Sequence, residues 1–178
     1  MSRSRYKFIP GDTSPYFLTA TTVNWLPLFN NPIIAEIIFD SLRFLQAHNR
    51  LTIYAYVLME NHIHLIASAE ILEKEIANFK SFTARKSIDH YLSGENSFIL
   101  EQLAFHKIPH RIDRDYQFWQ QGVHPQQIQS AAMLRQKIEH MHHNPVRRGY
   151  VELPEHWRYS STRNYAEMEG LLDVCKDW

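Results

Sequence analysis

Two strand-like stretches separated by only two residues constrain the fold of this chain most. Residues 51–59 read LTIYAYVLM and residues 62–69 read HIHLIASA, and both are rich in aliphatic, aromatic and β-branched residues that favour strands. The two residues between them, Glu60 and Asn61, are enough for a tight β-hairpin. The two stretches are therefore expected to be antiparallel neighbours in a sheet.

Strand-like and helix-like patterns alternate along the rest of the chain. Residues 16–23 read YFLTATTV, which predicts a strand. Asn31 and Pro32 have the residue types of a helix cap and first turn, and they open a helical pattern that lasts to Asn49. The apolar residues that recur there at three- and four-residue spacing are Ile33, Ile37, Ile38, Leu42, Leu45 and Ala47.

Similar patterns extend to the last third of the chain. Residues 70–92 predict a second helix, whose expected buried residues are Ile71, Ile76, Phe79, Phe82 and Ile88. A strand is expected within residues 116–123 and a helix over residues 126–143, whereas residues 98–115 show no clear pattern. Asn144 and Pro145 should stop or kink that last helix, because proline disfavours helical angles in the residue before it. The order of elements predicts an α+β protein with a ferredoxin-like antiparallel sheet and packed helices.

The composition limits the kind of protein. A length of 178 residues suits a single domain, here expected as a core at about 14–149 and a basic, aromatic tail at 150–178. Nineteen basic residues balance nineteen acidic ones, which argues against a protein that coats long duplexes. The single cysteine, the absence of a secretory pattern at the N-terminus and the absence of a long apolar run predict a cytoplasmic protein that does not enter membranes.

Two histidines on the strand expected at 62–69 are candidate metal ligands. Side chains alternate between the faces of a strand, so His62 and His64 project from one face and Ile63 from the other. Imidazole suits several first-row metals, and a pair of imidazoles leaves coordination positions open for a substrate oxygen. The alternative is that these are two ordinary histidines on a half-exposed strand, and the spacing alone does not exclude it.

Several blocks in one order resemble a known family. The run Tyr56–Leu65 (YVLMENHIHL) resembles the signature of the single-tyrosine HUH transposases, an IS200-like family with two histidines around a hydrophobic residue. Further matching blocks follow in the family's order: 79–83 (FKSFT), 118–120 (FWQ), 144–149 (NPVRRG) and 157–161 (WRYSS). The last block is typical of the REP-associated tyrosine transposases. The resemblance covers nearly the whole chain.

The resemblance implies a fold, a reaction and a site. It implies a ferredoxin-like core with the histidine motif on a central strand, and nicking and joining of single-stranded DNA beside short hairpins. It also implies Mg²⁺ or Mn²⁺ held by His62 and His64, with Asn144 as a third ligand.

One position departs from the family. Its members carry a tyrosine nucleophile four residues before the asparagine of the Asn-Pro-Val block, and this chain has His140 there. A histidine can attack phosphorus itself, activate water as a general base, or simply line a DNA groove. The other tyrosines, among them Tyr116, Tyr150 and Tyr165, are expected to pack rather than react.

Basic and aromatic residues are the candidate DNA contacts, because such residues hold the phosphates and unpaired bases of single strands. They are Arg3, Arg5, Lys80, Arg135, Lys137, Arg147, Arg148, Trp157, Arg158 and Tyr159. The alternative is a solvated surface with the usual acidic partners. The expected partner is single-stranded or hairpin DNA, bound by a monomer or a homodimer.

The sequence thus favours a metal-dependent, transposase-like endonuclease and strand-transferase with His140 in place of the nucleophilic tyrosine. Three alternatives stay open: a catalytically degenerate protein that binds hairpin DNA, a hydrolytic metal-dependent nuclease, and a metalloprotein unrelated to nucleic acid.

Overall fold

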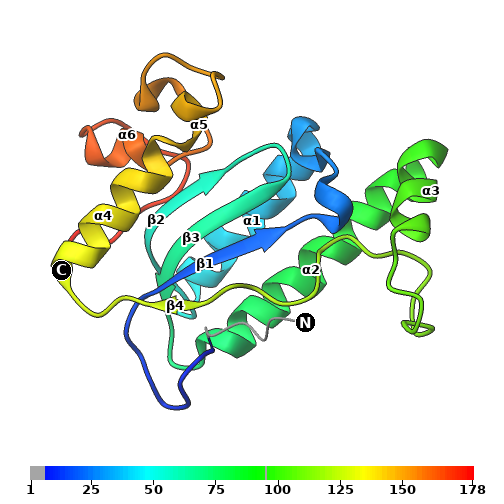
Figure 1. Cartoon of the computed structure of the whole chain (residues 1–178), viewed down its shortest axis with the longest axis horizontal. Helices are drawn as coiled ribbons and strands as arrows, with labels where there is room; N and C mark the ends of the chain where they lie inside the picture. Colours follow the sequence, from blue (N-terminus) through cyan, green and yellow to red (C-terminus); the bar gives the residue numbers. More distant parts are fainter. Residues whose placement is uncertain (1–6, 95) are drawn as a thin grey trace.

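A four-stranded antiparallel sheet lies at the centre of the protein, for which a computed structural model describes residues 7–94 and 96–178 (Figure 1). The strand order is β2-β3-β1-β4. The strands are β1 (Tyr16–Thr21), β2 (Thr52–Leu58), β3 (His62–Ser68) and β4 (Gln126–Gln127). The predicted hairpin is confirmed: β2 and β3 pair antiparallel, and the amide of Met59 donates to the carbonyl of His62 at 2.8 Å.

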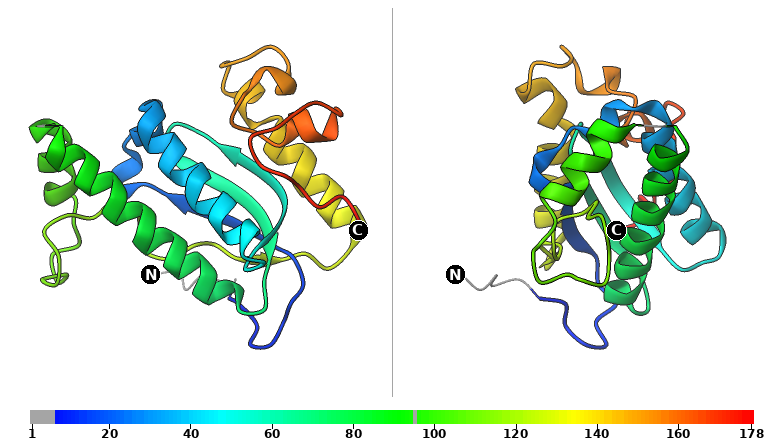
Figure 2. Two further views of the ribbon diagram at one scale, coloured as in Figure 1. Left: turned by 180° about the vertical axis from the view of Figure 1, so that it is seen from behind. Right: turned by 90° about the vertical axis from the view of Figure 1, so that its right-hand side faces the viewer.

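Helices cover both faces of the sheet (Figure 2, right). The helices are α1 (Pro32–Ala47), α2 (Leu72–Ser93), α3 (Ser97–Phe105), α4 (Ala131–His142), α5 (Asn144–Arg147) and α6 (Thr162–Tyr165). On β3, Ile63 and Leu65 point into the core beneath α1 and α2, while Ile66 joins a smaller cluster beneath α4. Helices packed on an antiparallel sheet confirm the predicted α+β class.

Helix α1 begins as the sequence predicts. The side chain of Asn31 accepts a hydrogen bond from the amide of Ile33 at 3.0 Å, and Pro32 is the first helical residue. The buried stripe differs from the predicted one, because Ile33 is 54% exposed whereas Ile34 is fully buried. Apolar residues occupy more than one face of this helix, so spacing alone does not choose which face packs.

Helix α2 also buries a different stripe from the predicted one. Ile76 and Phe79 are buried as expected, but Ile71 and Phe82 are exposed. Small polar residues replace them in the interior: Thr83 and Ser87 are fully buried. The hydroxyl of Thr83 donates to the carbonyl of Phe79 at 2.8 Å, which removes the cost of burying it.

The strand predicted within 116–123 is wrong. Gln117, Phe118 and Trp119 are all buried in succession, so the segment cannot alternate between a core face and a solvent face. Beside the end of β1 it forms one isolated bridge, between Thr22 and Trp119, and the amide of Gln120 donates to the carbonyl of Thr21 at 2.8 Å, while the short strand β4 lies further along the chain. Helix α3 accounts for part of the stretch for which the sequence gives no pattern.

The end of α4 follows the prediction at Asn144 and Pro145. Its start lies later than residue 126, since Ser130 caps it by accepting from the amide of Met133 at 3.1 Å. The helix ends at His142, and α5 begins at Asn144 after a change of direction (Figure 1). The predicted stop or kink before the proline is therefore confirmed.

The C-terminal segment runs beside the outer strand β2 and satisfies its edge. The amide of Leu58 donates to the carbonyl of Tyr159 at 2.8 Å, and the amide of Ser161 donates to the carbonyl of Tyr56 at 2.9 Å. Further along, the amide of Cys175 donates to the carbonyl of Ile53 at 2.8 Å. A covered edge cannot pair with another chain.

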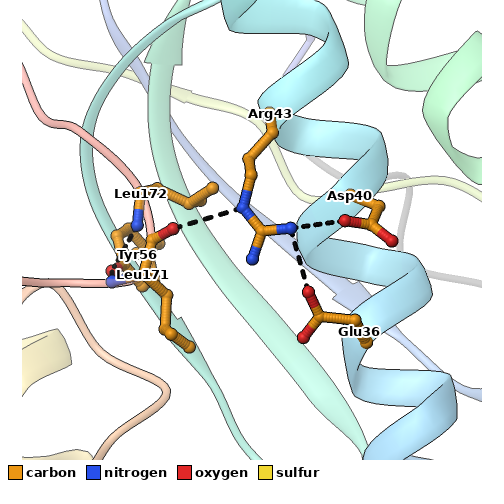
Figure 3. A network of polar contacts seen from close by, with 6 residues as sticks. All are labelled: Glu36, Asp40, Arg43, Tyr56, Leu171 and Leu172. Carbon is orange, nitrogen blue, oxygen red and sulfur yellow. Dashed lines mark hydrogen bonds and ion pairs between the residues drawn. The ribbon is translucent and has the colours of Figure 1, made fainter.

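A polar network ties the same segment to α1 (Figure 3). The phenol oxygen of Tyr56 accepts from the amides of Leu171 and Leu172 at 3.0 and 3.2 Å. Arg43 donates to the carbonyl of Leu171 at 3.5 Å and pairs with Glu36 at 2.9 Å and with Asp40. In the described part of the chain, no helix has the length and apolar character needed to cross a bilayer.

Candidate functional site

The paired histidines lie on β3, on the face that α4 covers. Their ring centroids are 4.7 Å apart and the rings meet edge to face. His62 is 8% exposed and His64 is half-buried, whereas Ile63 between them packs into the opposite core. The strand alternation predicted from the sequence therefore brings the two imidazoles together beneath α4.

Each of these imidazoles is oriented through one ring nitrogen. Nδ1 of His62 lies 2.7 Å from the side-chain oxygen of Asn61, and Nδ1 of His64 lies 2.8 Å from the hydroxyl of Thr19. The oxygen of Asn61 can only accept, so His62 carries its proton on Nδ1 and keeps the lone pair on Nε2. A hydrogen bond to the second nitrogen is the usual way in which proteins orient a metal-binding histidine.

Cationic and aromatic groups surround His64. Phe17 of β1 stacks on it with 5.2 Å between centroids, and Nζ of Lys137 lies 4.8 Å from the ring of Phe17. The guanidinium of Arg147 donates to the backbone carbonyl of His140 at 2.6 Å, which ties α5 to the last turn of α4. His140 itself is exposed. A negatively charged group is favoured in such surroundings.

Burial and positive neighbours keep these histidines neutral. Burial, His62, His140 and Lys137 lower the pKa of His64 to about 3. Burial lowers the pKa of His62 despite the opposing charge of Glu60, and burial together with Arg147 lowers the pKa of His140. Neutral imidazoles offer lone pairs at neutral pH, which metal binding and general base catalysis both require.

The residues present fit a metal ion that is held by few protein ligands. Within residues 7–94 and 96–178, no group of three or more His, Cys, Asp and Glu side chains gathers at one point. The chain offers two oriented imidazoles, and the third predicted ligand, Asn144, is the first residue of α5. Two or three protein ligands leave positions for substrate oxygens, as an ion acting on a phosphoryl group needs.

The hairpin turn contributes a group that the sequence analysis missed. Glu60, two residues before His62, pairs with Arg148 at 3.1 Å, and its side chain is only 13% exposed. Its second oxygen, Oε2, is buried and has no hydrogen-bond partner within the described chain. Tyr150 lies beside this carboxylate, and burial together with the Glu60 charge raises the pKa of its phenol. Only the tertiary structure brings the residues after α5 to the hairpin, so no local pattern could have indicated this contact.

Of the predicted DNA contacts, Lys137, Arg147 and Arg148 lie around the histidine pair. Lys80 lies elsewhere, on α2, which covers the opposite face of the sheet, and it donates to the carbonyls of Gln120 and Gly122 at 2.8 and 2.5 Å. Arg3 and Arg5 lie outside the described residues.

The predicted tail contacts are spread over the C-terminal segment. The indole of Trp157 donates to the carbonyl of Leu58 at 2.9 Å, and Tyr159 stacks on Phe39 with 5.8 Å between centroids. Arg158 is exposed, and Arg135 lies 5.6 Å from the ring of Trp178. The two aromatic residues are thus partly used in packing.

Comparison with known proteins links this architecture to one solved complex. No family model matches the sequence, and no curated protein matches it. A REP-associated tyrosine transposase bound to a REP hairpin superimposes with a TM-score of 0.65 and 16% identity, over 99% of this chain and 94% of that one. The chain shares the fold of this transposase. The predicted resemblance is therefore confirmed at the level of the fold.

A second solved structure is more distant. It is a protein of Deinococcus radiodurans R1 assigned as a transposase, with a TM-score of 0.46 and 19% identity over 79% of this chain and 98% of that one.

Proposed function

We propose that this protein is a transposase-like, metal-dependent endonuclease and strand-transferase that acts on single-stranded DNA at hairpins. The observation that carries the proposal is the pair of imidazoles 4.7 Å apart, each held through Nδ1, with Lys137, His140 and Arg147 beside them. The relative with the same fold was solved with a DNA hairpin, which supports DNA as the partner.

His62, His64 and Asn144 would hold Mg²⁺ or Mn²⁺. A bound divalent ion polarises a phosphoryl oxygen and so favours attack on phosphorus. Lys137 and Arg147 bind the negatively charged backbone beside the histidines and fix its position. The hydrogen bonds to Asn61 and Thr19 fix the orientation of the two rings and leave Nε2 of each available as a ligand.

His140 occupies the place from which attack is expected. It is exposed on the last turn of α4, and burial and neighbouring cations lower its pKa, so the imidazole is free to accept a proton or to attack. Direct attack on phosphorus would break one P–O ester bond, release a DNA hydroxyl and leave a phosphohistidine link, from which a second DNA hydroxyl would take the strand and free the imidazole. If His140 instead took a proton from water, the resulting hydroxide would displace the DNA hydroxyl, which is hydrolysis. A neutral His140 allows either route, so the hydrolytic nuclease is the second candidate.

The test is a denaturing gel of the protein with a labelled hairpin oligonucleotide and Mn²⁺. A band of DNA attached to protein supports strand transfer, and cut DNA without attachment supports the hydrolytic nuclease. Cleavage should disappear with EDTA and in His64→Ala, and it should persist in the control His48→Ala, which lies at the end of α1 on the other face. Intact DNA that still shifts on a native gel would leave only a hairpin-binding protein.

A second variant tests the role of position 140. His140→Tyr restores the residue type that the resemblance expects, so it should form more covalent adduct than the wild type if the surrounding site is competent. His140→Ala should lose both adduct and cleavage. Cleavage that is unchanged in His140→Ala would remove this residue from the reaction.

A further inference from the structure

A second basic region lies away from the histidine pair, between α2 and the returning segment 108–125. After α3 the chain makes a long loop and passes back across α2 toward β4 (Figure 1). The two walls enclose an open groove of about 1240 Å³. None of the paired histidines lines it, and α2 packs on the face of the sheet opposite to α4.

The wall that α2 contributes is a continuous stripe. Lys80, Ala84 and Ile88 follow one another at four-residue spacing, so they share one side of the helix. Tyr116 lies on the opposite wall, and the floor includes Trp119, which is buried. The groove therefore has an apolar and aromatic interior.

Hydrogen bonds hold the outer wall in place. Lys80 bridges from α2 to two carbonyls of residues 120–122, and Lys107 donates to the carbonyl of Arg114 at 2.8 Å. The side-chain oxygen of Gln117 accepts from the amide of Ile108 at 2.9 Å. The groove is thus built by specific contacts on both sides.

Positive charge exceeds negative charge around this groove. The cations that line it are Lys7, Lys80, Arg85, Arg111 and Arg114, and the carboxylates are Glu73, Asp89 and Asp113. Asp113 is shared between Arg114 at 2.7 Å and Arg111 at 3.9 Å, so one carboxylate serves two guanidinium groups. Arg85 and Lys7 are exposed, and neither pairs with a carboxylate of the described chain.

We propose that this groove binds a stretch of single-stranded DNA, separate from the strand at the histidine pair. Proteins hold unpaired strands with cations that track the backbone and aromatic surfaces that stack on bases, and this groove offers cations on both walls and the partly exposed ring of Tyr116. Its volume exceeds that of ordinary small-molecule pockets, which favours an extended polyanion over a single anion.

The proposal is independent of cleavage, since a strand can occupy the groove whether or not the histidine pair cuts. A hairpin substrate with a sufficiently long unpaired flank would contact both regions. The groove would then add affinity for the strand without touching the reacting phosphate.

The test compares Arg85→Glu with Lys86→Glu, two neighbouring charge reversals on α2, because Arg85 lines the groove whereas Lys86 lies against Phe82 outside it. Arg85→Glu alone should weaken binding more than Lys86→Glu does, and Arg85→Glu combined with Arg111→Glu reverses charge on both walls. Binding of fluorescein-labelled dT12 is measured by anisotropy in EDTA at several salt concentrations. The double variant should bind at least about tenfold more weakly, with a shallower salt dependence by about 1.4 in slope for two lost phosphate contacts.

The control should stay within about twofold of the wild type in the same assay. Equal affinities of the double variant and of Lys86→Glu would overturn the proposal, provided that both variants keep the wild-type thermal midpoint. Tighter binding of poly-glutamate than of dT12 would also overturn it and would assign the groove to acidic peptides.

Photo-crosslinking gives a second readout that does not depend on a variant. An oligonucleotide that contains 5-iododeoxyuridine should attach to the peptide that contains Tyr116. Crosslinks confined to α4 and α5 would contradict the proposal that the groove binds DNA.

The failure of this proposal can be distinguished from the failure of the proposed function. If the protein binds dT12 through the groove but never cuts hairpin DNA, only the proposed cleavage is wrong. If the double variant still cuts and binds dT12 as the wild type does, only the proposed groove is wrong.

Discussion

The two faces of the sheet are packed with different kinds of side chain. The face beneath α1 and α2 is a continuous apolar core, in which Ile34, Ile38 and Leu42 are completely buried. The face beneath α4 has a smaller apolar cluster and carries His62 and His64 beside it. Most of the buried apolar side chains therefore pack on the first face, whereas the second combines a smaller apolar cluster with the histidine pair.

Discrete polar contacts hold the α4 face together. Nε2 of His142, on α4, lies 2.8 Å from the hydroxyl of Ser161, which also accepts from the amide of Tyr56 at 3.0 Å. The pair of Glu60 with Arg148 joins α5 to the hairpin turn. These contacts orient α4 and α5 over β3, whereas apolar packing would do so with less directional precision.

The largest expected effect lies in the apolar core. Ile38→Ala removes a fully buried side chain and should lower the free energy of unfolding by about 2–5 kcal/mol in a denaturant titration. Ile33→Ala on the same helix removes an exposed side chain and should stay within about 0.5 kcal/mol. Similar losses of unfolding free energy in the two variants would mean that the buried face of α1 contributes no more to stability than its exposed face.

The same helix shows how far sequence reasoning reaches. The position of α1 follows from Asn31 and Pro32, because capping is a local interaction that the sequence contains in full. Its buried stripe does not, because Ile33 and Ile34 are equally apolar and only the packing against the sheet distinguishes them. The segment 116–123 fails for a related reason, since three consecutive residues are buried by different neighbours.

The histidine pair was predictable, but its surroundings were not. Alternation along a strand places His62 and His64 together, and that depends on β3 alone. Thr19 reaches His64 only because β1 pairs with β3 in one register, and Glu60 meets Arg148 across 88 positions of sequence. Such contacts depend on the tertiary structure, which one sequence does not reveal.

The next largest effect is a loss of folding stability in acid, caused by a buried histidine on the α4 face. Burial and His143 lower the pKa of His142 to about 4, below the ordinary value of 6.5. The unfolded chain therefore takes up this proton first, so stability is complete above pH 6.5 and is lost as the pH falls toward 4. The loss from this group should be on the order of 2–3 kcal/mol between pH 7 and 4.

His142→Gln isolates this group, because its amide still reaches Ser161 but does not titrate. In urea titrations with EDTA, the difference in unfolding free energy between wild type and variant should change over that pH range and be constant from pH 7 to 8. A difference that does not depend on pH would assign the acid sensitivity to other groups.

A smaller loss is expected at the other end of the same contact. Ser161→Ala leaves the buried amide of Tyr56 and the ring of His142 without their shared partner, so it should cost about 1–3 kcal/mol. Ser93→Ala, at an exposed hydroxyl near the end of α2, is the control and should change stability by less than about 0.5 kcal/mol.

Ser161→Ala should also weaken hairpin binding, because the orientation of α4 depends on the contact between Ser161 and His142. A variant that loses stability but binds the hairpin as the wild type does would separate the contact from the site.

The smallest effect is expected in the charged network on α1, where the polar contacts lie over the apolar core instead of the histidine site. The side chain of Arg43 is 40% exposed and that of Glu36 is 49% exposed, so water screens their attraction. Asp40 also pairs with Arg43, and this pair remains when Glu36 is neutralised (Figure 3). Glu36→Gln should therefore change the free energy of unfolding by less than about 0.5 kcal/mol, and this small change should vanish in high salt. A loss above about 1 kcal/mol that resists salt would show that Arg43 needs both carboxylates to hold the carbonyl of Leu171. In that case polar contacts would also support the stable face, and the contrast between the two faces would lie in the chemistry of their interiors alone.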